Sequence, residues 1–91
     1  MNTEAALKKL ESAIGRPIEE WARNNGLSVD ETVKAVRRYL GGSRLRAYWA
    51  QLAVRLLFRD LGVPLDPLHE LPRADALMTL VVDRIKRKEA A

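Results

Sequence analysis

Apolar residues recur along the chain at the three- and four-residue spacing of helices, and glycine and proline separate the apolar segments. The clearest pattern lies between residues 29 and 40. Its apolar stripe consists of Val29, Val33, Val36 and Leu40. Ser28, followed three residues later by Glu31, has the capping-box pattern that begins many helices. Gly41 and Gly42 end the pattern, so the sequence predicts a helix over about 29–40.

Two shorter helices are expected before this segment. Thr3 is a suitable N-cap for a first helix that runs to about Ile14, and Gly15 is a suitable stop. Pro17 suits the first position of a second helix, which we expect to reach about Asn25.

The segment after the paired glycines predicts a long helix that Ser43 caps and that ends near Leu61. Its expected buried stripe consists of Leu45, Trp49, Leu52 and Leu56, widened by Tyr48, Ala53, Leu57 and Phe58. The remaining narrow polar seam consists of Gln51, Arg55 and Arg59. A helix with so little polar surface is usually packed on most sides, so we expect it at the centre of the fold.

A connection rich in proline follows, and a last helix is expected from about Arg73 to Lys88. The predicted fold is therefore mostly α. It is a single compact domain over residues 1–91, with about five helices around the long helix that begins after Ser43.

Composition excludes several classes of function. The chain has no cysteine, which rules out disulfides and thiolate metal sites and is typical of a cytoplasmic protein. No signal peptide is expected, and the most apolar run, 47–58, is too short to cross a membrane. His69 is the single histidine and has no ligand-spaced companions, so no metal or other cofactor is expected. Ser28 and Ser43 stand at cap positions without an activating histidine, so we expect no catalytic activity.

The positive charge is concentrated in the middle of the chain. Residues 32–59 contain seven basic and no acidic side chains, whereas the whole chain has a net charge of +4. The seven are Lys34, Arg37, Arg38, Arg44, Arg46, Arg55 and Arg59. Six are arginines, whose planar fork suits phosphates and base edges. The pattern favours a nucleic-acid-binding surface, with an ordinary solvated basic face as the alternative.

A helix-turn-helix is one interpretation of this region. Trp21, Ala22, Gly26 and Leu27 match the usual spacing of that motif, although the next apolar residues arrive one position late. A DNA-binding helix that starts at residue 29 would bring the acidic residues 30 and 31 close to phosphates, which is unfavourable.

A second interpretation rests on a family resemblance. Residues 35–44 read Ala-Val-Arg-Arg-Tyr-Leu-Gly-Gly-Ser-Arg, and residues 45–53 read Leu-Arg-Ala-Tyr-Trp-Ala-Gln-Leu-Ala. This stretch resembles the FinO/ProQ family of bacterial RNA chaperones, which carries an Ala-Leu-Arg-Arg-Tyr-Thr stretch, a small-residue turn and a tyrosine-leucine helix. Residues 59–64 are similar to the family's Arg-x-Asp-Leu-x-Gly-x-Pro block, but one residue shorter. Residues 13–15 and 26–28 are weakly similar to the family's entry helix and to the turn before its arginine-rich helix. The resemblance therefore spans about residues 13–64. Leu40 replaces the family's hydroxyl residue, and the family's small β-hairpin would fall near residues 54–66, where periodicity indicates helix.

The resemblance implies binding to the base of an RNA hairpin and its single-stranded 3′ tail. Tyr39 and Arg59 then occupy positions that match those of the family. Lys34, Arg37 and Arg38 are expected to contact phosphates. The full predicted interface consists of Lys34, Arg37, Arg38, Tyr39, Arg44, Arg46, Arg55 and Arg59. Tyr39 and Tyr48 border the basic segment and are candidates for stacking on bases. For Tyr39, packing in the core and stacking on a base are equally well supported. For Tyr48 and Trp49, core packing is favoured because they lie on an apolar helix.

The sequence therefore predicts a non-catalytic RNA-binding protein, with RNA preferred over DNA. Two alternatives stay open: a helix-turn-helix transcriptional regulator, and a small module, such as an antitoxin or an inhibitor, that binds a protein partner. In the second alternative, the apolar breadth of residues 45–58 would serve as a docking patch or a homodimer face.

Overall fold

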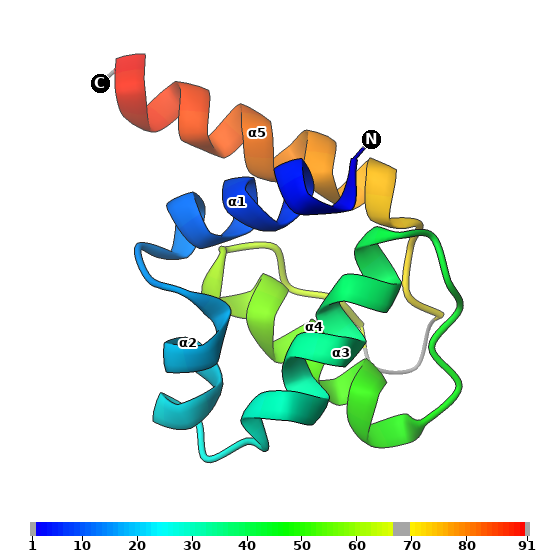
Figure 1. The fold of residues 1–91 in the computed structure, drawn as a ribbon. Coiled ribbons are helices and arrows are strands. Elements are labelled where there is room, and N and C mark those ends of the chain that lie inside the picture. Colours follow the sequence, from blue (N-terminus) through cyan, green and yellow to red (C-terminus); the bar gives the residue numbers. More distant parts are fainter. Residues whose placement is uncertain (1, 67–69, 91) are drawn as a thin grey trace.

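The computed structural model describes residues 2–66 and 70–90, with side chains described through residue 87 (Figure 1). The helices are α1 (Thr3–Ile14), α2 (Ile18–Asn24), α3 (Val29–Leu40), α4 (Tyr48–Asp60) and α5 (Ala74–Ala90). The prediction of a mostly α fold of about five helices is confirmed. Gly15 closes α1 as expected, with a left-handed backbone and its N–H bonded to the carbonyl of Glu11.

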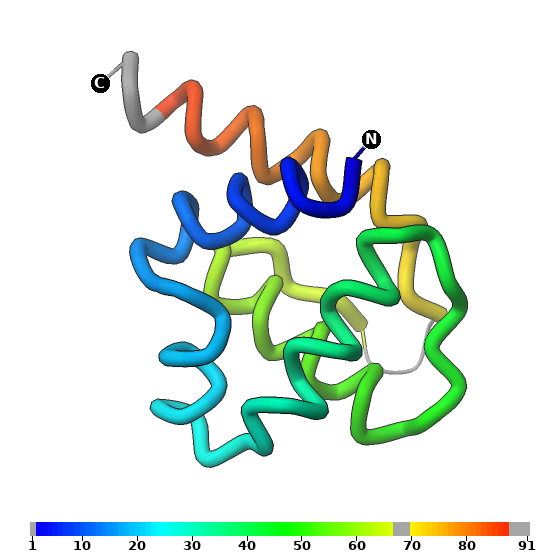
Figure 2. The backbone as a smooth tube through the Cα atoms, viewed as in Figure 1, coloured from blue at the N-terminus to red at the C-terminus, as the bar shows by residue number. Residues whose placement is uncertain are grey.

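The centre of the fold is α3, not the helix after Ser43. Figure 2 shows α3 crossing the middle of the molecule, and it packs against each of the other four helices. Its buried face is wider than the valine stripe, because Thr32, Ala35 and Tyr39 are buried while Val29 and Val33 are only partly covered. A helix with neighbours on several sides buries more than one stripe, and α3 has this arrangement.

Ser43 does not begin α4, which starts five residues later at Tyr48 with Ala47 in the cap position. The amide of Ser43 is instead bonded to the carbonyl of Arg38, and Gly42 adopts a left-handed backbone with φ of 90°. This arrangement closes the end of α3 and uses the residue that was expected to cap the next helix.

The β-hairpin considered for residues 54–66 is absent, and no strand occurs within the residues described. Residues 54–60 continue α4 instead and place Val54, Leu57 and Phe58 in the core, each fully buried. The ring of Phe58 meets the ring of Tyr39 edge to face, with centroids 6.1 Å apart. These contacts with α3 explain why the segment stays helical.

Several helix starts differ from the sequence prediction. Asn2, not Thr3, caps α1 by accepting a hydrogen bond from the amide of Glu4 at 2.9 Å. Pro17 occupies the cap position of α2 rather than its first turn. It supplies no side-chain bond, and the carboxylate of Glu11 accepts from the amide of residue 18 at 2.8 Å. The end of α1 therefore caps the start of α2.

Ser28 occupies the cap position of α3, but its side chain makes no capping hydrogen bond, so the expected capping box does not form. The last helix starts within one residue of its predicted position, with Leu77, Met78 and Val81 buried. It lies beside α1 at one side of the molecule (Figure 1).

Candidate nucleic-acid interface

The eight predicted interface residues come from three consecutive parts of the structure. Helix α3 carries Lys34, Arg37, Arg38 and Tyr39, the connection 41–47 carries Arg44 and Arg46, and α4 carries Arg55 and Arg59. Six of them are exposed, whereas Tyr39 and Arg55 are buried. The exposed members are candidates for contact with a polyanion in this conformation.

Tyr39 is a core residue. Only 5% of it is exposed, and its hydroxyl group donates a hydrogen bond to the backbone carbonyl of Pro72. Burial raises the pKa of the Tyr39 phenol above its ordinary value, and the negative charge of Asp75 adds to the shift. The expectation that Tyr39 stacks on a base is corrected, because its ring lies against Phe58 and is not presented to solvent.

Arg55 also lies inside the fold, with 9% of its surface exposed. Its Nη1 atom is 3.5 Å from Oε1 of Gln51, one turn earlier on α4. The predicted polar seam of this helix is thus largely covered, and only its last member, Arg59, is exposed. Arg55 is not presented to a ligand at the surface.

Three of the exposed arginines have carboxylate neighbours. Arg37 forms an ion pair with Glu4, and Arg44 forms one with Glu70. Arg59 lies 3.6 Å from the carboxylate of the residue that follows it. Exposed pairs of this kind contribute about 0–1 kcal/mol, so a phosphate can replace the carboxylate at small cost.

Lys34, Arg38 and Arg46 have no ion-pair partner among the described residues. Lys34 and Arg38 lie one turn apart on the exposed side of α3. Arg46 lies in the connection that leads to α4. Their charges are therefore available to an anionic partner.

Two aromatic residues at the start of α4 are exposed and are absent from the predicted interface, although Tyr48 was one of the candidates for stacking on bases. Tyr48 is 70% exposed and Trp49 is 46% exposed, although core packing was favoured for both. The buried stripe of α4 is a different one, formed by Ala50, Ala53, Val54, Leu57 and Phe58. This stripe has the same helical spacing as the predicted one, and it was the signal that could have placed Tyr48 and Trp49 outside the core.

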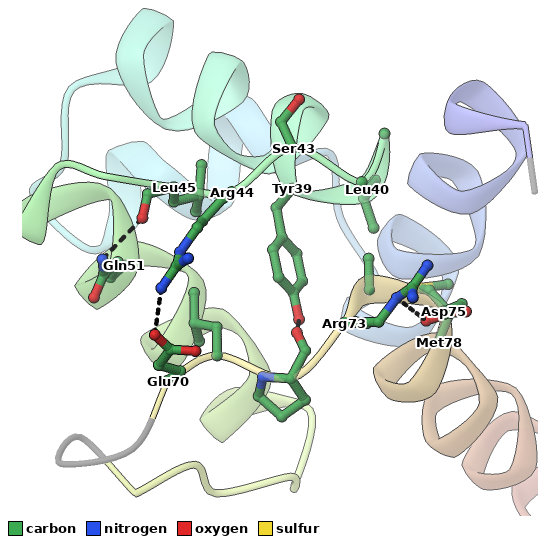
Figure 3. Close-up of a pocket in the computed structure, with 15 residues that line it drawn as sticks. Tyr39, Leu40, Ser43, Arg44, Leu45, Gln51, Glu70, Arg73, Asp75 and Met78 are labelled. Atoms are coloured by element: carbon green, nitrogen blue, oxygen red, sulfur yellow. Dashed lines mark hydrogen bonds and ion pairs between the residues drawn. The ribbon is translucent and has the colours of Figure 1, made fainter.

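A groove of about 460 Å³ lies between the connection after α3 and the segment that leads into α5. Figure 3 shows Arg44 and Glu70 meeting across it, Tyr39 reaching along it, and the side chain of Gln51 bonded to Leu45. The Gln51 amide donates to the carbonyl of Leu45 at 2.8 Å and so holds the connection against α4. The groove is lined by both basic and acidic side chains, so it has no single charge preference.

The described residues contain no group of three or more histidine, aspartate or glutamate side chains placed to hold a metal ion. His69 lies outside the described residues. In the part of the chain that the structure describes, no helix combines the length and apolar character needed to cross a membrane.

Comparison of the chain with protein-family models, with curated proteins and with solved structures finds no match. The resemblance to the FinO/ProQ family therefore stays a prediction from the residues.

Proposed function

We propose that this protein binds RNA without catalysing a reaction, and that residues 44–49 form the main contact. The proposal rests on the exposure of Tyr48 and Trp49, which follow the exposed Arg46 by two and three residues in the sequence. An unpaired base has two apolar faces that stack on aromatic rings, and its phosphate is an anion that an arginine can bind. The 44–49 segment offers both types of group within six residues.

The charge around this segment supports the same proposal. No acidic residue occurs in the sequence between 32 and 59. Among the described residues, the carboxylate that meets the 44–49 segment is that of Glu70, which forms an exposed ion pair with Arg44 and which a phosphate could replace at small cost. Lys34 and Arg38 add two unneutralised charges on the neighbouring helix α3. Binding of this kind is expected to weaken as salt is raised, because condensed counterions are released from the nucleic acid.

The acidic residues at the start of α3 favour RNA over duplex DNA as the ligand. In a helix-turn-helix, the start of the second helix enters the major groove. Here the corresponding positions on α3 carry Asp30 and Glu31, both exposed, and they would face the phosphates. Exposed aromatics suit the unpaired bases found in loops and tails of RNA.

The test is a binding titration with a labelled RNA hairpin that carries a single-stranded 3′ tail. The same hairpin without the tail and a DNA duplex of equal length are measured beside it, each at two salt concentrations. We expect tightest binding to the tailed hairpin and weaker binding at the higher salt concentration. Binding to none of the three at low salt would contradict the proposal and favour a protein partner for Tyr48 and Trp49. Preference for the duplex would favour the helix-turn-helix alternative.

Variants with matched controls separate stacking from charge. Trp49→Ala should weaken RNA binding by about tenfold, since loss of one stacked base contact costs about 1–3 kcal/mol. Leu80→Ala is the control, because Leu80 is exposed to the same extent (47%) but lies on α5. Arg46→Ala should weaken binding to all RNAs and reduce the salt dependence, whereas the exposed Arg23 of α2 should tolerate alanine. Equal effects of each variant and its control would exclude 44–49 as the interface.

A further inference from the structure

A second surface lies between α1 and α5. The two helices run side by side near the N-terminus and separate toward their other ends (Figures 1 and 2). A groove of about 350 Å³ occupies the gap. Its lining residues are Lys8, Lys9 and Ser12 from α1, and Val82, Ile85 and Lys86 from α5.

The groove has an incompletely covered aliphatic wall. Leu77, Met78 and Val81 of α5 are at most 2% exposed. Further along the same helix, Val82 and Ile85 are only partly buried. Across the groove α1 presents Lys8, Lys9 and Ser12 to this part of α5, and none of these three is an apolar residue. An apolar side chain of a partner would bury more of this wall and be stabilised by leaving water.

The rim of the groove is positively charged. Lys8, Lys9 and Lys86 are exposed, and no carboxylate is among the described residues that line the groove. None of the three lysines has an ion-pair partner within the described part of the chain. The nearby carboxylate of Glu11 is bonded to the amide of Ile18 at the start of α2. The rim therefore presents charge that the described protein residues do not neutralise.

We propose that this groove binds an acidic amphipathic helix of a partner protein. Apolar residues of the helix would pack on Val82 and Ile85, and carboxylates beside them would pair with the three lysines. A helix placed in the gap would continue the helix-against-helix packing of the fold, which is a common mode of peptide recognition. A nucleic acid fits this groove less well, because the described residues of its lining include no aromatic ring or arginine on which a base could stack. The site is separate from the 44–49 segment, so one chain could hold both partners.

The proposal is tested with the full chain and a fluorescein-labelled synthetic peptide. The peptide carries leucines at helical spacing of three and four residues, flanked by glutamates, and a scrambled peptide of the same composition is the control. We expect the patterned peptide to bind and the scrambled peptide to bind at least about tenfold more weakly. Amide chemical shifts of Lys8, Ser12, Val82 and Ile85 should move on binding. Equal binding of the two peptides, or shift changes confined to other helices, would overturn the proposal.

Charge reversal supplies the second arm of the test. The triple variant Lys8→Glu, Lys9→Glu and Lys86→Glu should weaken peptide binding by about tenfold or more, since three favourable pairs become repulsive. Its matched control is Arg16→Glu, Arg23→Glu and Arg73→Glu, three exposed residues outside the groove. Circular dichroism of both variants is the check that they fold.

Three results would overturn the proposal when the two triple variants and the wild type are measured with the peptide, with phosphatidylserine vesicles and with RNA. One is equal loss of peptide binding in the two triple variants. Another is binding to phosphatidylserine vesicles without binding to the peptide, which would assign the groove to a lipid surface. The third is loss of RNA binding with unchanged peptide binding in the groove variant, which would assign it to nucleic acid. Failure of the RNA proposal leaves the peptide result unaffected, because different variants report on each.

Discussion

The hydroxyl group of Tyr39 donates a hydrogen bond to the backbone carbonyl of Pro72, which lies 33 residues further along the chain. The bond joins the central helix α3 to the segment that leads into α5, and the groove of Figure 3 lies beside it. This bond adds to the burial of Ala74, Leu77 and Met78 in holding the start of the last helix against the core.

Tyr39→Phe should lower the free energy of unfolding by about 1 kcal/mol. The ring and its contact with Phe58 remain, and only the hydrogen bond to Pro72 is lost. Urea denaturation followed by circular dichroism measures the change. RNA binding should be unaffected, because Tyr39 is buried. A stable variant with strongly reduced RNA affinity would instead indicate that the hydroxyl group contacts RNA directly.

Alkaline pH should destabilise the protein through the same residue. The pKa of Tyr39 is raised in the folded state by burial, whereas in the unfolded chain it is near the ordinary value of about 10. Above this pH the unfolded state loses the proton while the folded state keeps it. The free energy of unfolding should therefore fall with a slope approaching about 1.4 kcal/mol per pH unit, from about pH 10 upward. Denaturation of the wild type and Tyr39→Phe across a pH range on both sides of this value isolates the contribution, since a phenylalanine side chain cannot ionise. Parallel curves would contradict the assignment.

The hydrogen bond between Trp21 and Asp60 should contribute measurably to stability. The indole N–H of the buried Trp21 donates to the Asp60 carboxylate at 2.9 Å and joins α2 to the end of α4. Asp60→Ala leaves this donor without its acceptor and should cost about 1–3 kcal/mol. Asp60→Asn keeps an acceptor oxygen and should cost less. Urea unfolding in a Trp49→Phe background reports on Trp21 fluorescence alone, and equal costs of the two substitutions would contradict the role of the bond.

Glycine is required at position 62 because the backbone there is left-handed, and not because a Cβ atom would lack space. Its φ is 81°, and the carbonyl of Gly62 accepts a hydrogen bond from the exposed Arg84 at 3.1 Å. The three atoms nearest to a Cβ at this position all belong to the guanidinium of Arg84, the end of an exposed and flexible side chain that can move into solvent. Gly62→Ala should therefore cost about 1–2 kcal/mol, as should Gly15→Ala, where φ is 84° and no neighbour lies within 4 Å.

The control for this prediction is Gly62→Ala in an Arg84→Ala background. Thermal unfolding should show the same cost in both backgrounds, because the strain belongs to the backbone. A cost that disappears when Arg84 is removed would show that crowding, not φ, makes glycine necessary.

Local sequence patterns determined most of the helix boundaries. The Val29–Leu40 helix follows from its apolar spacing and flanking breakers, and Gly15 closes α1 through its own conformational freedom. The concentration of basic residues between 32 and 59 is likewise a property of the sequence alone. These features depend on residues within one or two turns of each other, so no long-range contact is needed to predict them.

Tertiary contacts decided which side of each helix is buried. Helix α4 offers two apolar stripes of equal spacing, and its packing against the rest of the fold, chiefly against α3, selects the one that contains Val54 and Phe58. The same choice exposes Tyr48 and Trp49 and covers Arg55. Tyr39 becomes a core residue because Pro72, distant in sequence, supplies a partner for its hydroxyl group. The proposed RNA interface thus depends on which apolar face of α4 packs against α3. The face that does not pack there carries Tyr48 and Trp49 at the surface.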